Sequence, residues 1–344
     1  MSDVSPLSET LERKGLLPFA APSYWLNLAS EDYRTCRRDE NGVPLDPILA
    51  QALPSAAELI DAPLESEDPL REKEHSPLPR LVHQYSSRLL IRVTGACPLY
   101  CRHCFRRNLL PSEREFISSK EILQAQGYLK EHPELREVLI SGGDPLSVPT
   151  EILETLFARL REARPGIFLR LCTRAPVSLP ERIDEALLSM LRKYKPLRLV
   201  IQANHPKELS GLFLEKIEKV LAAGIPVRSQ TVLLKGVNDD TNTLEALFSG
   251  LCRAGVDPYY LFQGDLARGS SHFRVPLSRG LAMYEELRTR LSGLEMPRYA
   301  VDAPDGAGKL YLPESVVSRR EDEQGVYWLL RAPDGSLHRY PEET

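Results

Sequence analysis

The sequence predicts an α/β fold in which parallel strands form a barrel or a partial barrel. Short β-type runs alternate with helix-like stretches over most of the chain after residue 87. Most of these strand–helix units are about 30 residues long, the length of a strand plus the helix that returns to the same end of the sheet. Six such units in series are typical of a barrel-like parallel sheet with helices on its outer face.

The predicted strands are short runs rich in apolar residues, and they cover residues 88–93, 137–140, 167–172, 198–202, 226–233 and 257–262. A seventh apolar run, at residues 299–301, precedes a glycine-rich turn. Between most of the strands, apolar residues recur every three or four positions, as at Leu153, Leu156 and Leu160, at Ile183, Leu187 and Leu191, and at Leu244, Leu247 and Leu251. This spacing predicts amphipathic helices that cover the sheet.

The chain divides into three predicted segments. Residues 1–85 are rich in Pro, Glu and Ser and form an N-terminal arm, partly helical, which we expect to make contacts between subunits of a homodimer or homotetramer. Residues 86–295 hold the strand–helix units of the barrel. Residues 296–344 form a short C-terminal extension.

The composition excludes several classes of protein. The 344 residues carry a formal net charge of −4 and no basic tail, so we expect no binding to nucleic acid. No apolar run approaches the roughly 18 residues of a membrane span, and the polar N-terminus lacks the features of a secretory signal. We therefore expect a cytoplasmic protein. Because thiols stay reduced there, clustered cysteines indicate metal or redox chemistry.

Three cysteines, Cys97, Cys101 and Cys104, lie within eight residues. A structural zinc ion needs four ligands, usually from two pairs, and the three other cysteines lie far away in the sequence. His103 lies between two of the cysteines, where it closes a tetrahedron poorly. A four-iron cluster normally takes four cysteines, so three of them leave one iron open to an external ligand. An open-site cluster is therefore favoured over zinc and over chance clustering.

Polar residues with chemical potential follow the predicted strands at their C-terminal ends, which share one face of a parallel barrel. They are Cys97 after the first strand, Gly142, Gly143 and Asp144 after the second, Thr173 and Arg174 after the third, Asn204 and His205 after the fourth, Asp265 after the sixth, and Asp302 after the seventh run. Loops are generally polar, but this mixture of cysteines, acids, glycines and an arginine at one end predicts an active site there.

The spacing CxxxCxxC is the signature of the radical S-adenosylmethionine (SAM) superfamily. Further blocks resemble the lysine 2,3-aminomutase family, among them "HSPLPRLVHQYSSRLLIRVTGACPLYCRHCFRR", "SGGDPLS", "NHPKEL", "SQTVLLKGVNDD", "PYYLFQGDLARGSSHFR" and "VDAPDGAGK". The resemblance runs from about Glu67 to the C-terminus. It implies a TIM-like partial barrel of six βα units, a 4Fe–4S cluster, SAM and pyridoxal 5′-phosphate (PLP), and an isomerase that moves an amino group from C2 to C3 of an amino acid.

The resemblance also implies a role for individual residues. Cofactor roles fall on Cys97, Cys101 and Cys104 as cluster ligands, on Gly142, Gly143 and Asp144 at the methionyl amino group of SAM, on Gln230 as a cofactor contact, on Tyr85 and Arg88 at the PLP phosphate, and on Lys309 as the lysine that binds PLP covalently. Substrate roles fall on Arg106 at the α-carboxylate and on Asp265 and Asp302 at a distal ammonium group.

Two acids at the side-chain end favour L-lysine as the substrate, with β-lysine as the product. Arginine is the runner-up and glutamate follows it. Further alternatives are a radical SAM enzyme without PLP, and a non-catalytic cluster or zinc protein. An electron donor such as flavodoxin or ferredoxin is the expected partner.

The chain departs from the family pattern at several positions. Gln84 stands where arginine is usual, Gln202 where histidine is common, and Phe262 where tyrosine is usual. Asp305 and Ala307 interrupt a run that is otherwise mostly glycine.

Overall fold

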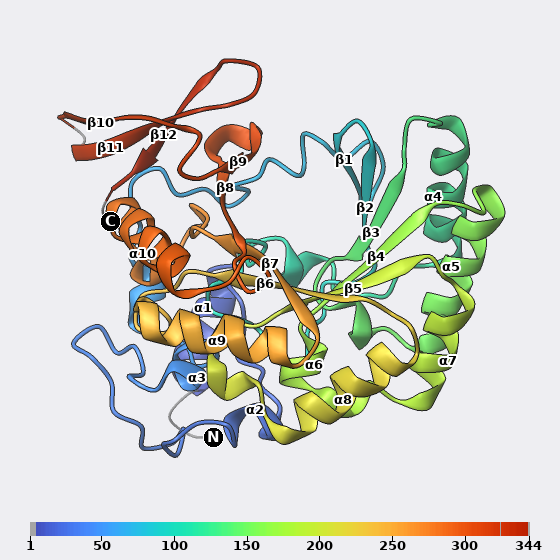
Figure 1. Ribbon diagram of the computed structural model, residues 1–344, viewed down its shortest axis with the longest axis horizontal. Coiled ribbons are helices and arrows are strands. Elements are labelled where there is room, and N and C mark those ends of the chain that lie inside the picture. Colours follow the sequence, from blue (N-terminus) through green and yellow to red (C-terminus); the bar gives the residue numbers. More distant parts are fainter. Residues whose placement is uncertain (1–4, 324, 343–344) are drawn as a thin grey trace.

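The computed structural model describes residues 5–323 and 325–342. Nine strands form one sheet in which neighbours in space follow the order of the sequence (Figure 1). They are β1 (Leu81–Tyr85), β2 (Arg88–Arg92), β3 (Glu137–Ser141), β4 (Phe168–Thr173), β5 (Leu197–Gln202), β6 (Val227–Val232), β7 (Val256–Phe262), β8 (Arg298–Ala303) and β9 (Gly308–Tyr311). All seven strand regions predicted from the sequence are therefore confirmed.

The sheet is a partial barrel. Strands β2 to β8 are parallel to their neighbours, whereas β1 pairs antiparallel with β2 and β9 pairs antiparallel with β8. Within the described chain, no pairing joins β1 to β9. The helices that follow strands β2 to β7 are α4 (Ser119–Glu131), α5 (Thr150–Ala163), α7 (Glu185–Lys193), α8 (Gly211–Ala222), α9 (Thr241–Arg253) and α10 (Leu277–Arg290). These six βα units confirm the predicted fold class.

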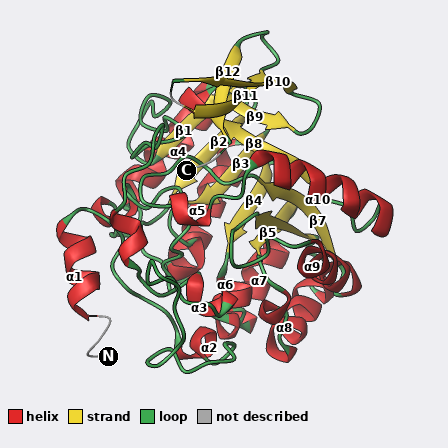
Figure 2. Ribbon diagram, turned by 90° about the vertical axis from the view of Figure 1, so that its left-hand side faces the viewer, coloured by secondary structure: helices red, strands yellow, loops and turns green. Residues whose placement is uncertain are grey.

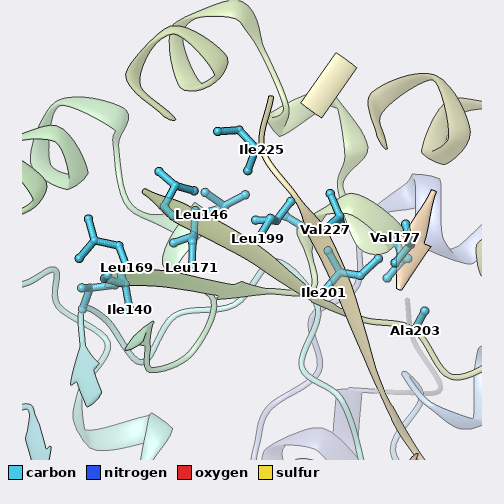
Figure 3. Close-up of a cluster of buried hydrophobic side chains, with 14 of the residues drawn as sticks. Ile140, Leu146, Leu169, Leu171, Val177, Leu199, Ile201, Ala203, Ile225 and Val227 are labelled. Atoms are coloured by element: carbon cyan, nitrogen blue, oxygen red, sulfur yellow. The ribbon is translucent and has the colours of Figure 1, made fainter. Parts of the chain in front are cut away.

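The main hydrophobic core lies between the outer face of the sheet and its helices. Along β4 the burial alternates with period two, as the pleat requires. Leu169 and Leu171 point outward into this core with neighbours such as Ile140, Leu199 and Ile201 (Figure 3). The alternate residues Arg170 and Cys172 face inward and line a cavity. The inner face of the barrel is thus left for polar chemistry.

The helix starts are set by short polar side chains that cap exposed backbone N–H groups. Ser118 caps α4 and forms a capping box with Glu121, while Asp184, Ser210 and Asp240 cap α7, α8 and α9. These caps fix where each helix begins relative to the preceding strand. The cysteine-bearing loop therefore ends at a well-defined point, the capped start of α4.

Two parts of the structure were not predicted in this form. The arm contains four short helical elements, α1 (Ser5–Arg13), α2 (Ser23–Leu26), α3 (Pro47–Ala50) and the 3-10 turn η1 (Ala56–Leu59). The C-terminal segment adds a separate antiparallel sheet of β10 (Val316–Asp322), β11 (Gly325–Arg331) and β12 (Leu337–Pro341). This small sheet and the helices α2 and α3 lie at opposite ends of the molecule (Figures 1 and 2).

Strands β8 and β9 belong to the large sheet although they lie in the C-terminal segment. The division into residues 1–85, 86–295 and 296–344 remains our proposal for the organisation of the chain. None of the helices in the described part of the chain combines the length and the apolar character that a membrane crossing requires.

The arm is fixed to the cysteine loop by one buried carboxylate. The side chains of Glu58, Arg102 and Arg107 are fully buried, and both arginines pair with Glu58. Arg102 Nε donates to Glu58 Oε1 at 3.0 Å, and Arg102 also donates to the backbone carbonyls of Leu17 and Pro18. Burial alone raises the pKa of the Glu58 carboxyl, but the two guanidinium groups outweigh it and lower that pKa to about 2. The carboxylate therefore stays ionised at any ordinary pH.

Replacing Glu58 by Gln is expected to lower the free energy of unfolding by about 3–5 kcal/mol, because it leaves two buried guanidinium groups without a countercharge. Urea denaturation measures this loss. The matched control is Glu12→Gln, which removes another arm-to-loop pair, with Arg114 at 3.1 Å, whose side chains are about half exposed. That control should change stability by less than about 1 kcal/mol. Equal losses from the two substitutions would contradict the expectation.

Candidate active site

The inner face of the barrel and the loops at the C-terminal strand ends enclose one cavity. It is lined by every residue to which the family resemblance gave a cofactor or substrate role, namely Tyr85, Arg88, Cys97, Cys101, Cys104, Arg106, Gly142, Gly143, Asp144, Gln230, Asp265, Asp302 and Lys309. These residues come from loops or strands spread over more than two hundred positions of the chain. Most of them meet because the carboxyl ends of parallel strands share one face. Tyr85 and Lys309 come instead from the antiparallel edge strands β1 and β9, and Arg88 begins β2. Of the other polar residues predicted at this face, Thr173 and Arg174 line the cavity, whereas Asn204 and His205 are not among its lining residues.

The cysteine triad lies in the loop after β2, and each of the three side chains is partly buried. Thiolates on one tetrahedral zinc ion lie about 2.3 Å from the metal and therefore roughly 4 Å from each other. Among the described residues, these three sulfurs do not form a group within 4.8 Å of one another. Burial raises the pKa of the Cys97 thiol, and burial together with the Cys101 thiol raises that of Cys104 to about 11. The three sulfurs are spread more widely than the ligands of one zinc ion. A multi-iron cluster, whose iron atoms lie apart from one another, fits this spacing better.

Glycines at 142 and 143 let the end of β3 pack directly against the cysteine loop. A Cβ atom at either position would overlap the carbonyl oxygen of Thr94 or Ala96. Gly142 also has a φ of +123°, a conformation that L side chains rarely adopt. The backbone N–H of Gly143 donates to Thr94, and that of Asp144 donates to Ala96 at 2.9 Å. The glycine pair thus sets the distance between the loop and the sheet.

The Asp144 carboxylate is fully engaged within the protein. It accepts hydrogen bonds from Thr173 Oγ1 at 2.6 Å and from the backbone N–H groups of Arg174 and Leu146 at 2.7 and 2.9 Å. Burial raises its pKa despite these donors. Asp144 therefore ties the ends of β3 and β4 together beside the cysteine loop.

Arg106 is buried and points into the cavity, but it already has a carboxylate partner. Its Nε and Nη2 atoms donate to Glu72 at 2.9 and 2.6 Å, and its Nη1 atom donates to Ser141 Oγ at 3.1 Å and to the carbonyl of Gly142 at 3.3 Å. Sequence reasoning missed Glu72, which lies in the irregular arm. No spacing within "DPLREKE" distinguishes it from the neighbouring acids.

At the other end of the cavity, Lys309 forms an ion pair with Asp302. Lys309 Nζ lies 2.9 and 3.0 Å from the two carboxylate oxygens and 3.9 Å from the ring centroid of Phe262. The Asp265 side chain also lines this region, and burial and the nearby Asp302 raise its pKa to about 8. Among the described residues, no group donates a hydrogen bond to the Asp265 carboxyl. The site therefore has room for one more cation.

Tyr85 and Arg88 lie beside the Lys309 loop. The Tyr85 hydroxyl accepts a hydrogen bond from the backbone N–H of Lys309 at 2.9 Å, and the Arg88 guanidinium lies 4.2 Å from the centroid of the Tyr85 ring. No carboxylate in the described chain pairs with Arg88, so its charge is available to an anion. Gln84, which replaces the usual arginine, donates instead to the carbonyl of Gly306 at 2.9 Å. This amide fixes the lysine loop and carries no charge.

An unexpected group surrounds Cys101. Arg174 Nη1 donates to Cys101 Sγ at 2.7 Å, while Arg174 Nη2 donates to Gln51 and lies near Glu208. The neighbouring His103 accepts from the amide of Asn204 at 3.2 Å, and burial keeps its pKa well below the usual range. Neutral His103 is therefore part of a hydrogen-bonded wall. Gln51 comes from the arm, so its role depends on tertiary packing that the sequence does not reveal.

The cavity separates its charges along its length. Thiols and Arg174 occupy one end, and Lys309 with two acids occupies the other. Arg106 acts electrostatically on both ends, because it interacts with Cys104 and opposes the rise in the pKa of Asp265 that burial and Asp302 cause. A zwitterionic molecule with a second cationic group matches this arrangement, since its carboxylate suits Arg106 and its second cation suits the two acids. The lysine amine is a nucleophile for a carbonyl, and the unpaired Arg88 suits a phosphate.

Comparison with known proteins agrees with these features. The family description "Radical SAM superfamily" matches residues 91–247. L-lysine 2,3-aminomutase of Clostridium subterminale is 39% identical over 318 residues, which cover 92% of this chain and 75% of that protein. Glutamate 2,3-aminomutase of Clostridioides difficile is 36% identical over 299 residues, which cover 87% and 70% of the two chains.

Among solved structures, Streptococcus suis SuiB bound to S-adenosylmethionine has a TM-score of 0.49 and 15% identity, and the match covers 72% of this chain and 56% of that one. Identity to the aminomutases extends over nearly the whole chain, including the arm and the lysine loop. The chain belongs to the lysine 2,3-aminomutase family of the radical SAM superfamily.

Proposed function

We propose that this protein is a SAM- and PLP-dependent 2,3-aminomutase that converts L-lysine to β-lysine. The observation that carries the proposal is the pairing of Lys309 with Asp302 beside the unpartnered Asp265. One ammonium group is already held by this acidic end of the cavity. A second acid with a raised pKa lies ready to accept the ammonium of a lysine side chain.

The cofactors follow from the residues that would hold them. Cys97, Cys101 and Cys104 would ligate the cluster, and its open iron would take SAM. Lys309 would bind PLP covalently, with Arg88 and Tyr85 beside its phosphate. When bound, the reduced cluster and SAM supply a radical that removes a hydrogen atom from the substrate, and PLP supplies a conjugated ring that stabilises an unpaired electron while nitrogen moves from C2 to C3.

The remaining proposed site residues orient cofactor and substrate. Gly142, Gly143 and Asp144 would support the methionyl end of SAM, and Gln230 would contact a cofactor from β6. The Arg106 guanidinium would hold the α-carboxylate, and the acids at the other end would hold the side-chain ammonium. Fixing both ends restricts the substrate to one orientation, which is how positioning accelerates a reaction.

The acidic end argues against glutamate as the preferred substrate. A terminal carboxylate beside Asp265 and Asp302 would add repulsion in a poorly solvated site, whereas an ammonium removes the repulsion already there. Arginine could pair with the same acids but needs more length. We further propose a reduced flavodoxin or ferredoxin as the electron donor, a homo-oligomeric state, and action in the cytoplasm.

Alanine substitution at Cys97, Cys101 or Cys104 is expected to remove bound iron and to abolish reductive cleavage of SAM, because three corners of the cluster need three thiolates. Iron and sulfide assays after anaerobic reconstitution, with detection of 5′-deoxyadenosine, measure both effects. Cys172→Ala is the control, since Cys172 lines the same cavity and burial raises its thiol pKa to about 11. Loss of the cluster in that control would count against the assignment.

Lys309→Ala is expected to retain the iron cluster and to lose covalent PLP. Borohydride reduction of the native enzyme, followed by peptide mapping, should place the pyridoxyl group on Lys309. The matched control is Lys207→Ala, which removes a lysine that pairs with Asp46 at 3.1 Å and is not among the residues that line the cavity. A label on any other lysine would refute the role of Lys309.

Lysine is expected to give the highest kcat/KM in a panel with arginine and glutamate, under anaerobic turnover with dithionite, SAM and PLP. Asp302→Ala should lower kcat/KM for lysine about a hundredfold or more, since it removes one partner of a poorly solvated ion pair. Because the pKa of Asp265 is about 8, this acid is mostly neutral below that pH and must lose its proton to pair with an ammonium.

The kcat/KM for lysine should therefore rise with pH through about 8, and Asp265→Asn should remove this rise. The control is the rate of SAM cleavage without amino acid, which should keep its own pH profile in the variant. Preferred turnover of glutamate by the unmodified enzyme would overturn the substrate assignment and leave the radical chemistry intact.

A further inference from the structure

We propose that Glu72 is the positioning residue for Arg106: it holds one edge of the guanidinium and so directs the other edge at the α-carboxylate of the amino acid substrate. This proposal rests on the proposed function and adds to it a residue from the N-terminal arm. It begins from the contacts of a buried acid that lines the cavity.

The two residues form a forked pair. The Nε and Nη2 atoms of Arg106 donate to the Glu72 carboxylate, with the shortest contact 2.6 Å, so the side edge of the guanidinium is occupied. The opposite edge consists of Nη1 and the second N–H of Nη2. Nη1 donates only to Ser141 Oγ and, at 3.3 Å, to the Gly142 carbonyl. This end edge is where a second carboxylate can bind by displacing one long contact.

The charged side chains around Glu72 alternate in sign and end in a cation, to which a further anion can bind. Glu113, Arg92, Glu72 and Arg106 form a chain of alternating charges, in which Arg92 pairs with Glu113 at 3.0 Å and lies 3.9 Å from Glu72. Burial raises the pKa of Glu72, but the guanidinium of Arg106, helped by that of Arg92, lowers it overall. Glu72 thus interacts with two cations, Arg106 and Arg92. A substrate carboxylate at Arg106 would complete the alternation.

The segment that carries Glu72 is itself anchored at the site. We call residues 66–76 the strap. Its first residue, Ser66, pairs with the loop after β7: its N–H donates to Leu266 at 2.8 Å, next to Asp265, and its carbonyl accepts from Arg268 at 3.0 Å. The Asp68 carboxylate then accepts from the backbone N–H of Glu72 at 2.9 Å.

Further along, the strap reaches the lysine loop. Arg71 and the carbonyl of Leu70 lie against Gly306, so closely that a Cβ at Gly306 would be 3.1 Å from Arg71 Cβ. The strap therefore touches the loop of Asp265, the loop of Lys309 and the guanidinium of Arg106. It fixes Glu72 relative to both ends of the proposed substrate.

An arginine side chain loses rotamer entropy when it is fixed in one orientation. Glu72 imposes this loss before the substrate arrives, and it also keeps the buried cation paired in the resting enzyme. The expected consequence is specific. Without Glu72, the enzyme should lose its preference for substrates with a carboxylate, and lose little of its chemical rate once the substrate is bound.

The test uses the holoenzyme loaded with its cluster, SAM and PLP. Calorimetric titration without reductant gives the Kd of L-lysine and of L-lysinamide, which lacks the carboxylate, and turnover with dithionite gives kcat and KM. Glu72→Gln should weaken lysine binding about tenfold. The NH2 group of the glutamine side chain is a donor and cannot accept a hydrogen bond from Arg106, so only one of the two guanidinium contacts is kept. The ratio of the lysinamide Kd to the lysine Kd should fall toward one, and kcat should stay within about threefold. Glu72→Asp, which keeps the charge, should restore part of the ratio.

The matched control is Glu113→Gln, which removes the other acid of the chain and does not touch Arg106. It should leave the Kd ratio unchanged. An unchanged ratio in Glu72→Gln would overturn the proposal and leave Glu72 a structural residue, and tighter lysine binding would overturn it by showing that Glu72 competes with the substrate. If the unmodified enzyme binds lysinamide as well as lysine, Arg106 holds no carboxylate, and the role of Arg106 in the proposed function fails together with that of Glu72.

Discussion

The pairing of Glu58 with both Arg102 and Arg107 is the interaction on which the cysteine loop depends. The loop has little regular structure, so beyond a few backbone hydrogen bonds to β3 and to the arm its position depends on side chains. Two guanidinium groups flank the third cysteine in the sequence, and both converge on one carboxylate of the arm. Because a buried charge without a partner is costly, neither the arm nor the loop can move away without the other. This constraint explains why "CRHCFRR" is basic although its arginines do not all face the cavity.

The second constraint is the pleat of the sheet. Alternate residues of β4 point outward to an apolar core and inward to the cavity, so one strand contributes both to stability and to the site. The apolar pattern of a strand does not reveal what inward residues such as Arg170 and Gln230 do. They are polar residues within strands that are otherwise buried. Among the described strands no pairing joins β1 to β9. The lysine loop lies beside β1, since Gln84 donates to the Gly306 carbonyl, and the strap packs against Gly306 from residues 70 and 71.

The sequence predicted those features that depend on local pattern. The seven parallel strands and the helices around Leu156, Leu187 and Leu247 followed from periodicity, and the cysteine triad followed from its spacing. Strands β1 and β9, with the sequences LVHQY and GKLY, were missed because neither contains a longer apolar run and both are defined by antiparallel pairing at the edges of the sheet. In the C-terminal sheet, β10 was missed because it is largely exposed and charged. Strands β11 and β12 carry the buried residues Leu330 and Tyr340, but they follow no strand–helix rhythm and are defined by antiparallel pairing.

The partners of the site residues were missed for a different reason. Glu58, Glu72 and Gln51 lie in an arm whose composition indicates irregular chain, and each acts across a long sequence separation on a residue of the barrel. A single sequence contains no signal for such a pairing, since any of several acids in the arm could form it. Family resemblance indicated the groups that we expect to meet ligands. Only the fold shows the groups that hold them.

The described site residues share one arrangement of charge. Arg106 faces a carboxylate, Asp302 faces an ammonium, and the Cys101 sulfur faces a guanidinium. These three proposed ligand-binding groups thus already have a partner of the charge that their ligands would bring, whereas Arg88 and Asp265 have none among the described residues. Exchanging one partner for another in a poorly solvated cavity costs less than stripping water from a bare charge, because the desolvation has already occurred on folding. Under the proposed function, covalent binding of PLP would take from Asp302 the positive charge that Lys309 now brings to it. The same carboxylate would then serve both the resting lysine and a cationic substrate.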